Sequence, residues 1–266
     1  MKVSRVLAVI ALAGVVATTA SAQRIFGGPR DFGSKEMAKI FGKNDAFSAV
    51  ADMTVVENQG KQTIQMEMNY AFLKGDLRTE SDMASMKGVA IPPEAAAHIK
   101  QMGMDRTVSI FLTDKHLTYL VYPGLKAFCE ISRDQSSPTG TNEDKQAKIE
   151  VTELGKETVD GHPCVKKKMT ITDDDGTQRV VIAWRATDLK DFPIKAEIEN
   201  ANSTITIHFR DVKLSPPPAS DFTPPSDYTR YTSVQEMMMG NMQRFMPPGG
   251  EMPPRGSMHP PQNNQE

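Results

Sequence analysis

The sequence predicts a mainly β protein with few helices (α+β), built on an antiparallel sheet of about eleven strands. The first observation is the strict alternation of apolar and polar residues from Ile64 to Phe72, which places one set of side chains on a core face. The second is the turn chemistry between such runs, as in Lys74-Gly75-Asp76 and Pro123-Gly124. The third is that only two short segments have a helical pattern. With 39% hydrophobic residues in 266, the chain has apolar material for one core.

Each expected strand is a run of alternating or β-branched residues that ends at a turn signal. The run Asp173-Asp174-Asp175-Gly176 lacks the ligand spacing of a calcium loop and fits a hairpin turn. The expected strands are Phe47–Glu57, Ile64–Phe72, Asp76–Asp82, Arg106–Thr113, Lys115–Tyr122, Leu125–Ile131, Lys148–Thr158, Cys164–Thr172, Gln178–Arg185, Phe192–Glu199 and Ser203–Leu214.

Two helices are expected outside these strands. The first begins at the N-cap residue Ser34 and ends at Gly42. The second begins at Pro92-Pro93 and ends at Gly103, with Ala95, Ile99 and Met102 on one side. It lies in an insertion between two strands, so it is a candidate lid or plug over the apolar face of the sheet. Ordinary core packing is the alternative that the sequence alone favours.

The first 22 residues have the pattern of a secretory signal peptide. Lys2 and Arg5 precede an uncharged apolar stretch, and Ala20-Ser21-Ala22 is a small-x-small cleavage site. A retained transmembrane anchor is the alternative, but the stretch is shorter than the roughly 20 residues that span a bilayer. No Cys lies at the cleavage point, since Cys129 and Cys164 are far downstream, so no lipid anchor is expected. We therefore expect a periplasmic or secreted protein, soluble after cleavage following Ala22.

The remaining chain divides into three expected parts. Residues 23–46 form an N-terminal segment with a short helix, 47–232 the sheet domain, and 233–266 a disordered tail rich in Met and Pro. Thioethers favour Cu(I), which makes the tail a weak candidate for a soft-metal site against the simpler low-complexity interpretation. The methionines counted for it are Met237, Met238, Met239, Met242, Met246, Met252 and Met258.

Catalytic signatures are absent from the sequence. It contains no G-x-S-x-G, H-E-x-x-H, P-loop or G-x-G-x-x-G motif. None of the five histidines has a second ligand or base at a productive local spacing. The near-neutral formal charge of −2 excludes a strongly basic nucleic-acid-coating protein. We therefore expect no enzyme, no cofactor, no metal and no nucleic-acid partner.

The two cysteines are candidates for a disulfide. An exported chain with Cys129 and Cys164 as its only cysteines favours a bridge over two free thiols. In a simple meander, however, the two residues would lie about 9 to 10 Å apart across an intervening strand, beyond bridging reach. Either the bridge forms beyond the strand ends or the strand order is not a simple meander.

Several motifs resemble the exported bacterial family called domain of unknown function 4412. They are the run from Glu153 to Lys166, Trp184 in a strand, Phe192-Pro193-Ile194 in the next strand, and the closing segment from Phe222 to Tyr228. The family is similar to the periplasmic lipoprotein carriers and sensors LolA, LppX and RseB. The resemblance implies an open, strongly curved antiparallel sheet, a half-barrel of about eleven strands with helices plugging its concave face.

The function implied by this fold is an exported soluble binding protein that holds a lipid or acyl chain in the concavity, where flexible methionines reshape easily. The alternative is an envelope sensor or protein-interaction module that uses the same concavity for a protein partner without lipid transport. A purely structural envelope protein is a third interpretation. The residues expected to line the cavity are Met66, Met68, Tyr70, Phe72, Ile110, Leu112, Trp184, Ile205, Ile207 and Phe209.

Overall fold

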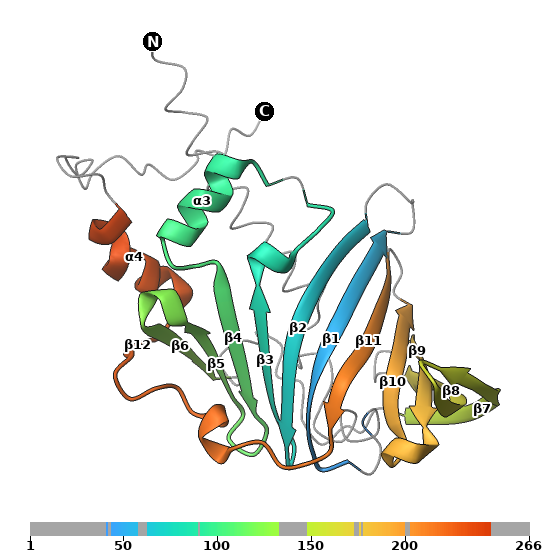
Figure 1. The fold of residues 1–266 in the computed structure, drawn as a ribbon. Coiled ribbons are helices and arrows are strands. Elements are labelled where there is room, and N and C mark those ends of the chain that lie inside the picture. The colour runs from blue at the N-terminus through green and yellow to red at the C-terminus, as the bar shows by residue number, and fades with distance from the viewer. Residues whose placement is uncertain are drawn as a thin grey trace, which may run out of the picture.

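A single curved, unclosed sheet of twelve strands forms the protein (Figure 1). The computed structural model describes residues 41, 44–57, 63–89, 91–132, 148–172, 176, 178–199 and 203–245. The expected fold class, a mainly β half-barrel with few helices, is confirmed. The strands are β1 (Ala46–Glu57), β2 (Thr63–Leu73), β3 (Asp76–Asp82), β4 (Arg106–Leu112), β5 (Leu117–Tyr122), β6 (Ala127–Ser132), β7 (Lys148–Val159), β8 (His162–Thr172), β9 (Gln178–Ala186), β10 (Phe192–Glu199), β11 (Ser203–Lys213) and β12 (Thr229–Tyr231).

The sheet consists of two antiparallel meanders joined side by side. Strands β1 to β6 form one and β7 to β11 the other, and the order across the sheet is β12-β6-β5-β4-β3-β2-β1-β11-β10-β9-β8-β7. The seam between the meanders is the antiparallel pair β1–β11, which runs from Ser48 opposite Lys213 to Glu57 opposite Ser203. The chain therefore passes from one edge of the sheet to the other between β6 and β7.

The twelfth strand makes the sheet mixed rather than purely antiparallel. β12 pairs in parallel with β6, with Thr229 opposite Ala127 and Tyr231 opposite Cys129. Three residues are too few for a recognisable alternation, so the sequence predicted eleven strands. Strand β6 also begins later than expected, because Pro123–Leu125 form a 3-10 turn (η2) and Lys126 adopts a left-handed conformation with φ 48°.

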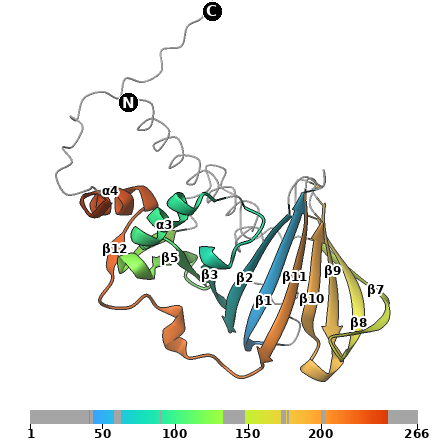
Figure 2. The same ribbon diagram turned by 45° about the horizontal axis from the view of Figure 1, so that its top comes forward.

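Two α-helices and several 3-10 turns accompany the sheet. Helix α3 (Pro93–Gln101) matches the expected second helix, and α4 (Val234–Phe245) follows β12. Figures 1 and 2 place both helices at the β4–β6 side of the sheet. The other short turns are η1 (Met83–Ser85), η4 (Thr187–Leu189) and η5 (Ala219–Phe222).

Helix α4 corrects the prediction that the chain is disordered from residue 233. Met237 is fully buried in a cluster with residues of β5 and β6, and Asn241 donates a hydrogen bond to the Met237 carbonyl. The helix has an N-terminal cap as well, since the backbone N–H of Glu236 donates to Ser233 Oγ. The high Met and Pro content of the whole tail concealed this helix from composition-based reasoning.

Four predicted features lie largely outside the described residues. They are the signal peptide, the helix from Ser34 to Gly42 apart from Phe41, the Asp173–Gly176 turn apart from Gly176, and the tail beyond Phe245.

Candidate apolar binding face

The candidate site is the inner, concave face of the central strands. On β1 this face carries alternate apolar residues from Phe47 to Val55, each at most 5% exposed. The strand register then fixes which neighbouring residues share the face, because side chains opposite each other in an antiparallel pair point the same way. The inner-face residues are Ile64, Met66, Met68, Tyr70 and Phe72 on β2, and Ile205, Ile207 and Phe209 on β11.

Aromatic rings fill one part of this face. The ring centroid of Phe47 lies 4.6 Å from that of Phe41 and 4.9 Å from that of Phe192. Phe209 meets both Phe192 and Tyr70 edge-on at 5.4 Å, a favoured arrangement for aromatic pairs. Burial raises the pKa of Tyr70 to about 12, so its hydroxyl stays protonated at physiological pH. We call these five residues the aromatic cluster.

A second group, the methionine cluster, occupies the part of the inner face nearer the β1–β2 loop. Its centre is Met53, Val55, Met66 and Ile205, all buried. Met68 and Ile207, which pack against this centre, are partly exposed. Met53 and Val55 were missing from the predicted cavity lining, although the alternation from Phe47 to Val55 was a signal for them. The other residues packed against this cluster are Ile64, Met86 and Ile198.

Small residues continue the inner face beyond β11. Ile207 lies opposite Ala196 of β10, and Ala196 lies opposite Ala183 of β9. Both alanines are buried, with 3% of the surface of Ala196 and none of that of Ala183 exposed, so larger neighbouring side chains cover this row.

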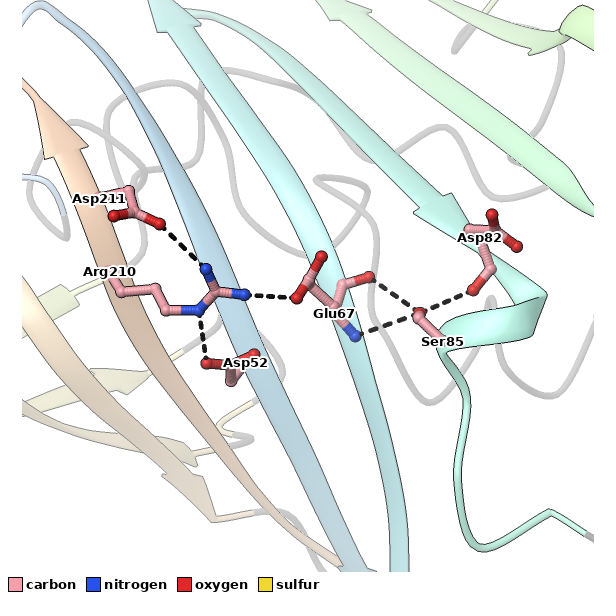
Figure 3. A network of polar contacts seen from close by, with 6 residues as sticks. All are labelled: Asp52, Glu67, Asp82, Ser85, Arg210 and Asp211. Carbon is pink, nitrogen blue, oxygen red and sulfur yellow. Dashed lines mark hydrogen bonds and ion pairs between the residues drawn. The ribbon is translucent and has the colours of Figure 1, made fainter.

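The outer face of the same central strands is polar, as Figure 3 shows. Arg210 Nε lies 3.0 Å from Asp52 Oδ2 and Arg210 Nη1 lies 2.9 Å from Asp211 Oδ2, while Nη2 contacts Glu67. Ser85 Oγ donates to the Glu67 carbonyl at 3.4 Å. Charged side chains that are half exposed belong against water, so a site for an apolar ligand on these strands lies on the inner face.

Seven of the ten predicted cavity residues share the inner face and three do not. Leu77 of β3 lies opposite Phe72 and Phe111 of β4 lies opposite Leu77, so the alternate residues Ile110 and Leu112 point outward. There they pack with Phe222 of η5. The expectation that Ile110 and Leu112 line the concavity is therefore wrong. The strand has apolar residues on both faces, so its sequence did not reveal which face was the inner one.

Trp184 is the third residue on the opposite face. Its strand neighbour Ala183 points inward, whereas Trp184 lies opposite Lys166 and Lys195. The two ammonium groups lie 4.5 Å and 4.2 Å from the centroid of the indole ring, which is cation–π geometry. The indole N–H donates to Glu157 Oε1. Trp184 is thus buried on the outer face, in an apolar cluster with Cys164, Ala186 and Ile194, and the two lysines cover its ring with their aliphatic stems. The prediction that it lines the concavity is wrong.

The predicted disulfide is also wrong, since both cysteines are free and buried. Cys129 lies on β6 and Cys164 on β8, near opposite edges of the sheet. Two cysteines could lie on nearby strands only if β6, β7 and β8 followed one another in a simple meander. Instead, the chain crosses the sheet between β6 and β7, which places the two cysteines far apart. Burial raises the pKa of the Cys129 thiol to about 11, with a further contribution from Glu236. Burial likewise raises the pKa of Cys164.

The three predicted lid residues lie on the side of α3 that faces the protein. Ile99 and Met102 are buried and Ala95 is partly exposed. The end of the helix is held against η2, where a Cβ atom on Gly124 would lie 2.5 Å from Gly103 Cα. That α3 opens as a lid stays a prediction.

Within the described ranges, no three or more His, Cys, Asp or Glu side chains are grouped so that they could hold a metal ion. No helix in the described part of the chain is long and apolar enough to cross a membrane.

Several solved structures are similar to this chain. The structure of LprF from Mycobacterium bovis matches with a TM-score of 0.37 and 14% identity, covering 73% of this chain and 97% of that one. The lipoprotein LppX from Mycobacterium tuberculosis matches with a TM-score of 0.34 and 12% identity, covering 62% and 85%. A LolA superfamily protein from Nitrosomonas europaea matches with a TM-score of 0.32 and 12% identity, covering 70% and 93%. No curated protein matches the sequence.

The family expected from the sequence motifs is confirmed. The family model described as "Domain of unknown function (DUF4412)" matches residues 47–192, which span β1 to the first residue of β10 and include the Gly-x-x-Cys turn and Trp184. This stretch is more than half of the chain. The protein therefore belongs to the DUF4412 family.

Proposed function

We propose that the protein is an exported binding protein that holds a lipid or another acyl-chain ligand against its inner face. The observation that carries the proposal is the contrast between the two faces of the central strands. The inner face is continuously apolar across β2, β1, β11 and β10, whereas the outer face of β2, β1 and β11 carries the Arg210 network.

The side chains of the methionine cluster suit a ligand of variable shape. Thioether chains have three rotatable bonds and reshape at small cost. Met68 and Ile207 are partly exposed on the inner face, so an acyl chain laid over them would contact them without displacing the sheet. Burying each of its methylene groups would contribute about 0.8 kcal/mol.

The test is titration of the purified mature protein with a fluorescent fatty-acid probe. Ile207→Gln places an amide on the inner face, and we expect it to weaken probe binding about tenfold, because an apolar contact of ~1.5 kcal/mol is lost. Thr206→Gln is the matched control: Thr206 is the preceding residue of β11 and points outward. Equal binding by both variants, with equal urea midpoints, would contradict an inner-face site.

The nature of the natural ligand is tested by native mass spectrometry of protein isolated without detergent. A co-purifying lipid would support the carrier function. Repeated absence of lipid, together with a captured envelope protein, would support the sensor alternative.

One observation favours the protein-interaction alternative. β7 is an edge strand, paired only with β8, and its side chains of Val151 and Leu154 are 57% and 49% exposed. Edge strands offer free backbone groups to a partner strand. A peptide added at β7 would leave the inner face free, so the fatty-acid titration in the presence of a captured partner separates the two functions.

A further inference from the structure

Two buried sulfur atoms lie in contact under α4, on strands other than those of the proposed lipid site. Cys129 Sγ lies 3.9 Å from Met237 Sδ, and neither residue has any exposed surface. Met104 and Met238 pack against the same buried apolar cluster. These residues come from β6, α4 and the segment after α3, so the fold and not the local sequence brings them into one cluster. We call the four residues the sulfur cluster.

The donor set is selective in its chemistry. One thiol and several thioethers are soft ligands, which favour Cu(I) over the harder divalent ions that need oxygen or imidazole donors. The spacing is suitable too. With metal–sulfur bonds of about 2.3 Å, two sulfurs on one ion in trigonal or tetrahedral geometry are about 3.8 to 4.0 Å apart, so Cys129 and Met237 would bind the same ion with little movement.

We propose that the sulfur cluster is a binding site for one soft monovalent metal ion, Cu(I) or its analogue Ag(I). Cys129 Sγ and Met237 Sδ are two of the ligands, and a thioether of Met104 or Met238 is the third. On binding, the Cys129 thiol releases its proton to solvent and the thiolate bonds to the ion, so the site gains no net charge. No oxidation or reduction takes place, because the ion enters and stays in its monovalent state.

Access to the cluster is through α4. This helix follows the last strand of the sheet, so its displacement breaks none of the described strand pairs and uncovers Cys129. Met239, two residues after Met237, is 63% exposed. Three consecutive methionines thus run from the buried cluster to the surface, and an exposed thioether is a first contact for an incoming ion.

The experiment is anaerobic titration of the reduced full-length mature chain with Cu(I), in competition with a chromogenic Cu(I) chelator, repeated with Ag(I) and with Zn(II). We expect one Cu(I) or Ag(I) per chain and no comparable affinity for Zn(II). Cys129→Ser should weaken binding at least 100-fold, because even the loss of an outer-shell partner costs about 10–100-fold. Met237→Leu keeps the volume of the side chain and should weaken binding about tenfold or more.

The chain contains matched controls. Cys164→Ser removes the other buried thiol, which lies near the opposite edge of the sheet, and should leave the affinity unchanged. Met169→Leu changes a buried methionine far from α4 in the same way. Met104→Leu and Met238→Leu identify the third ligand by which of them weakens binding. Should Cys129→Ser unfold, Cys129→Ala keeps the site testable.

X-ray absorption of the Cu(I) complex should show sulfur ligands only. Binding that survives in Cys129→Ser or Cys129→Ala would overturn the proposal. So would binding that is insensitive to Met237→Leu but lost when Met246, Met252 and Met258 are all changed to Leu, since the ion would then be held by the tail. None of these outcomes depends on whether the inner face binds lipid.

Discussion

The two ends of the sheet solve the problem of an exposed edge in different ways. At one end, β6 is covered by the short parallel strand β12 and by α4, whose Met237 is buried among apolar residues. At the other end, β7 is left unpaired on its outer side, and a buried Trp184 on β9 is held between two lysines. Apolar clusters stabilise both ends, but at the β7–β9 end charged side chains also cover the large ring of Trp184.

The two ends should respond to different perturbations. Packing under α4 depends on volume and responds little to salt, whereas ion pairs and cation–π contacts near the surface weaken as salt screens them. The bare edge has its own protection, because a bulge between Glu153 and Gly155 interrupts β7 and charged side chains lie along it. Bulges and charges on an edge strand discourage non-specific aggregation through that edge, but they do not prevent the addition of a matching peptide strand.

The largest effect is expected from Trp184→Ala, which removes the central side chain of the β7–β9 end. We expect a loss of about 3–5 kcal/mol in the free energy of unfolding, typical of truncating a buried tryptophan, measured by urea denaturation. Trp184→Phe should cost less, because a ring remains between Lys166 and Lys195. A loss below about 1 kcal/mol for the alanine variant would show that the lysines, and not the ring, stabilise this end.

At the opposite end, Met237→Ala should cost about 2–4 kcal/mol, because it leaves a cavity beside Cys129. Met237→Leu conserves volume and should cost less than about 1.5 kcal/mol. The urea midpoints of the two variants measure the difference. If both were close to the unaltered protein, α4 would contribute nothing to stability and the comparison between the ends would fail.

Glu80 of β3 tests whether charged side chains also contribute to stability away from the β7–β9 end. Desolvation raises the pKa of Glu80, but hydrogen bonds and charge from Arg78 and Arg106 outweigh it, so that the net pKa lies below the usual value. A carboxylate with a lowered pKa in the folded state stabilises it above the unfolded pKa of about 4.5, and this contribution disappears as the pH falls through the folded pKa.

Glu80→Gln should therefore cost about 1–2 kcal/mol at pH 7, in the range of hydrogen bonds to charged groups, and progressively less as the pH falls below 4.5. Unfolding free energies of both proteins across this pH range measure the effect. A cost independent of pH would mean that the Glu80 side chain contributes through packing alone.

The smallest effect is expected from Lys195→Ala, which removes one of the two cations over Trp184. A partly exposed cation–π contact contributes about 0.5–1 kcal/mol, and part of that should vanish in 1 M salt. Lys213→Ala, at the end of β11 and with no ring beside it among the described contacts, is the control. If both variants lost the same unfolding free energy at low and high salt, the contact between Lys195 and Trp184 would make no electrostatic contribution to stability.

Local patterns predicted the strands well, because alternation is a local property. The alternation in β2 correctly placed Met66, Met68, Tyr70 and Phe72 on one face. The method failed where both faces of a strand are apolar, as at Ile110-Phe111-Leu112 and at Trp184, which packs in an apolar cluster on the outer face. In both strands the sequence lacks the polar positions that would reveal the face.

Long-range arrangement was beyond the same reasoning. No local sequence pattern indicates that β7 lies at the opposite edge of the sheet from β6. The expected bridge between Cys129 and Cys164 failed because it required these strands to be near each other. β12 is too short to have a pattern. The sulfur cluster is a product of the same arrangement, since Cys129 and Met237 are 108 residues apart in sequence.

The seam between β1 and β11 has a consequence for how the protein matures. Its paired residues are separated by about 150 residues of chain, and contacts between such distant segments slow folding because long loops must close first. Each meander can form from hairpins as it is synthesised. The central strands β1 and β11, however, cannot pair until nearly the whole polypeptide has left the ribosome. A chain with this connectivity therefore completes the central seam of its sheet only late in its synthesis.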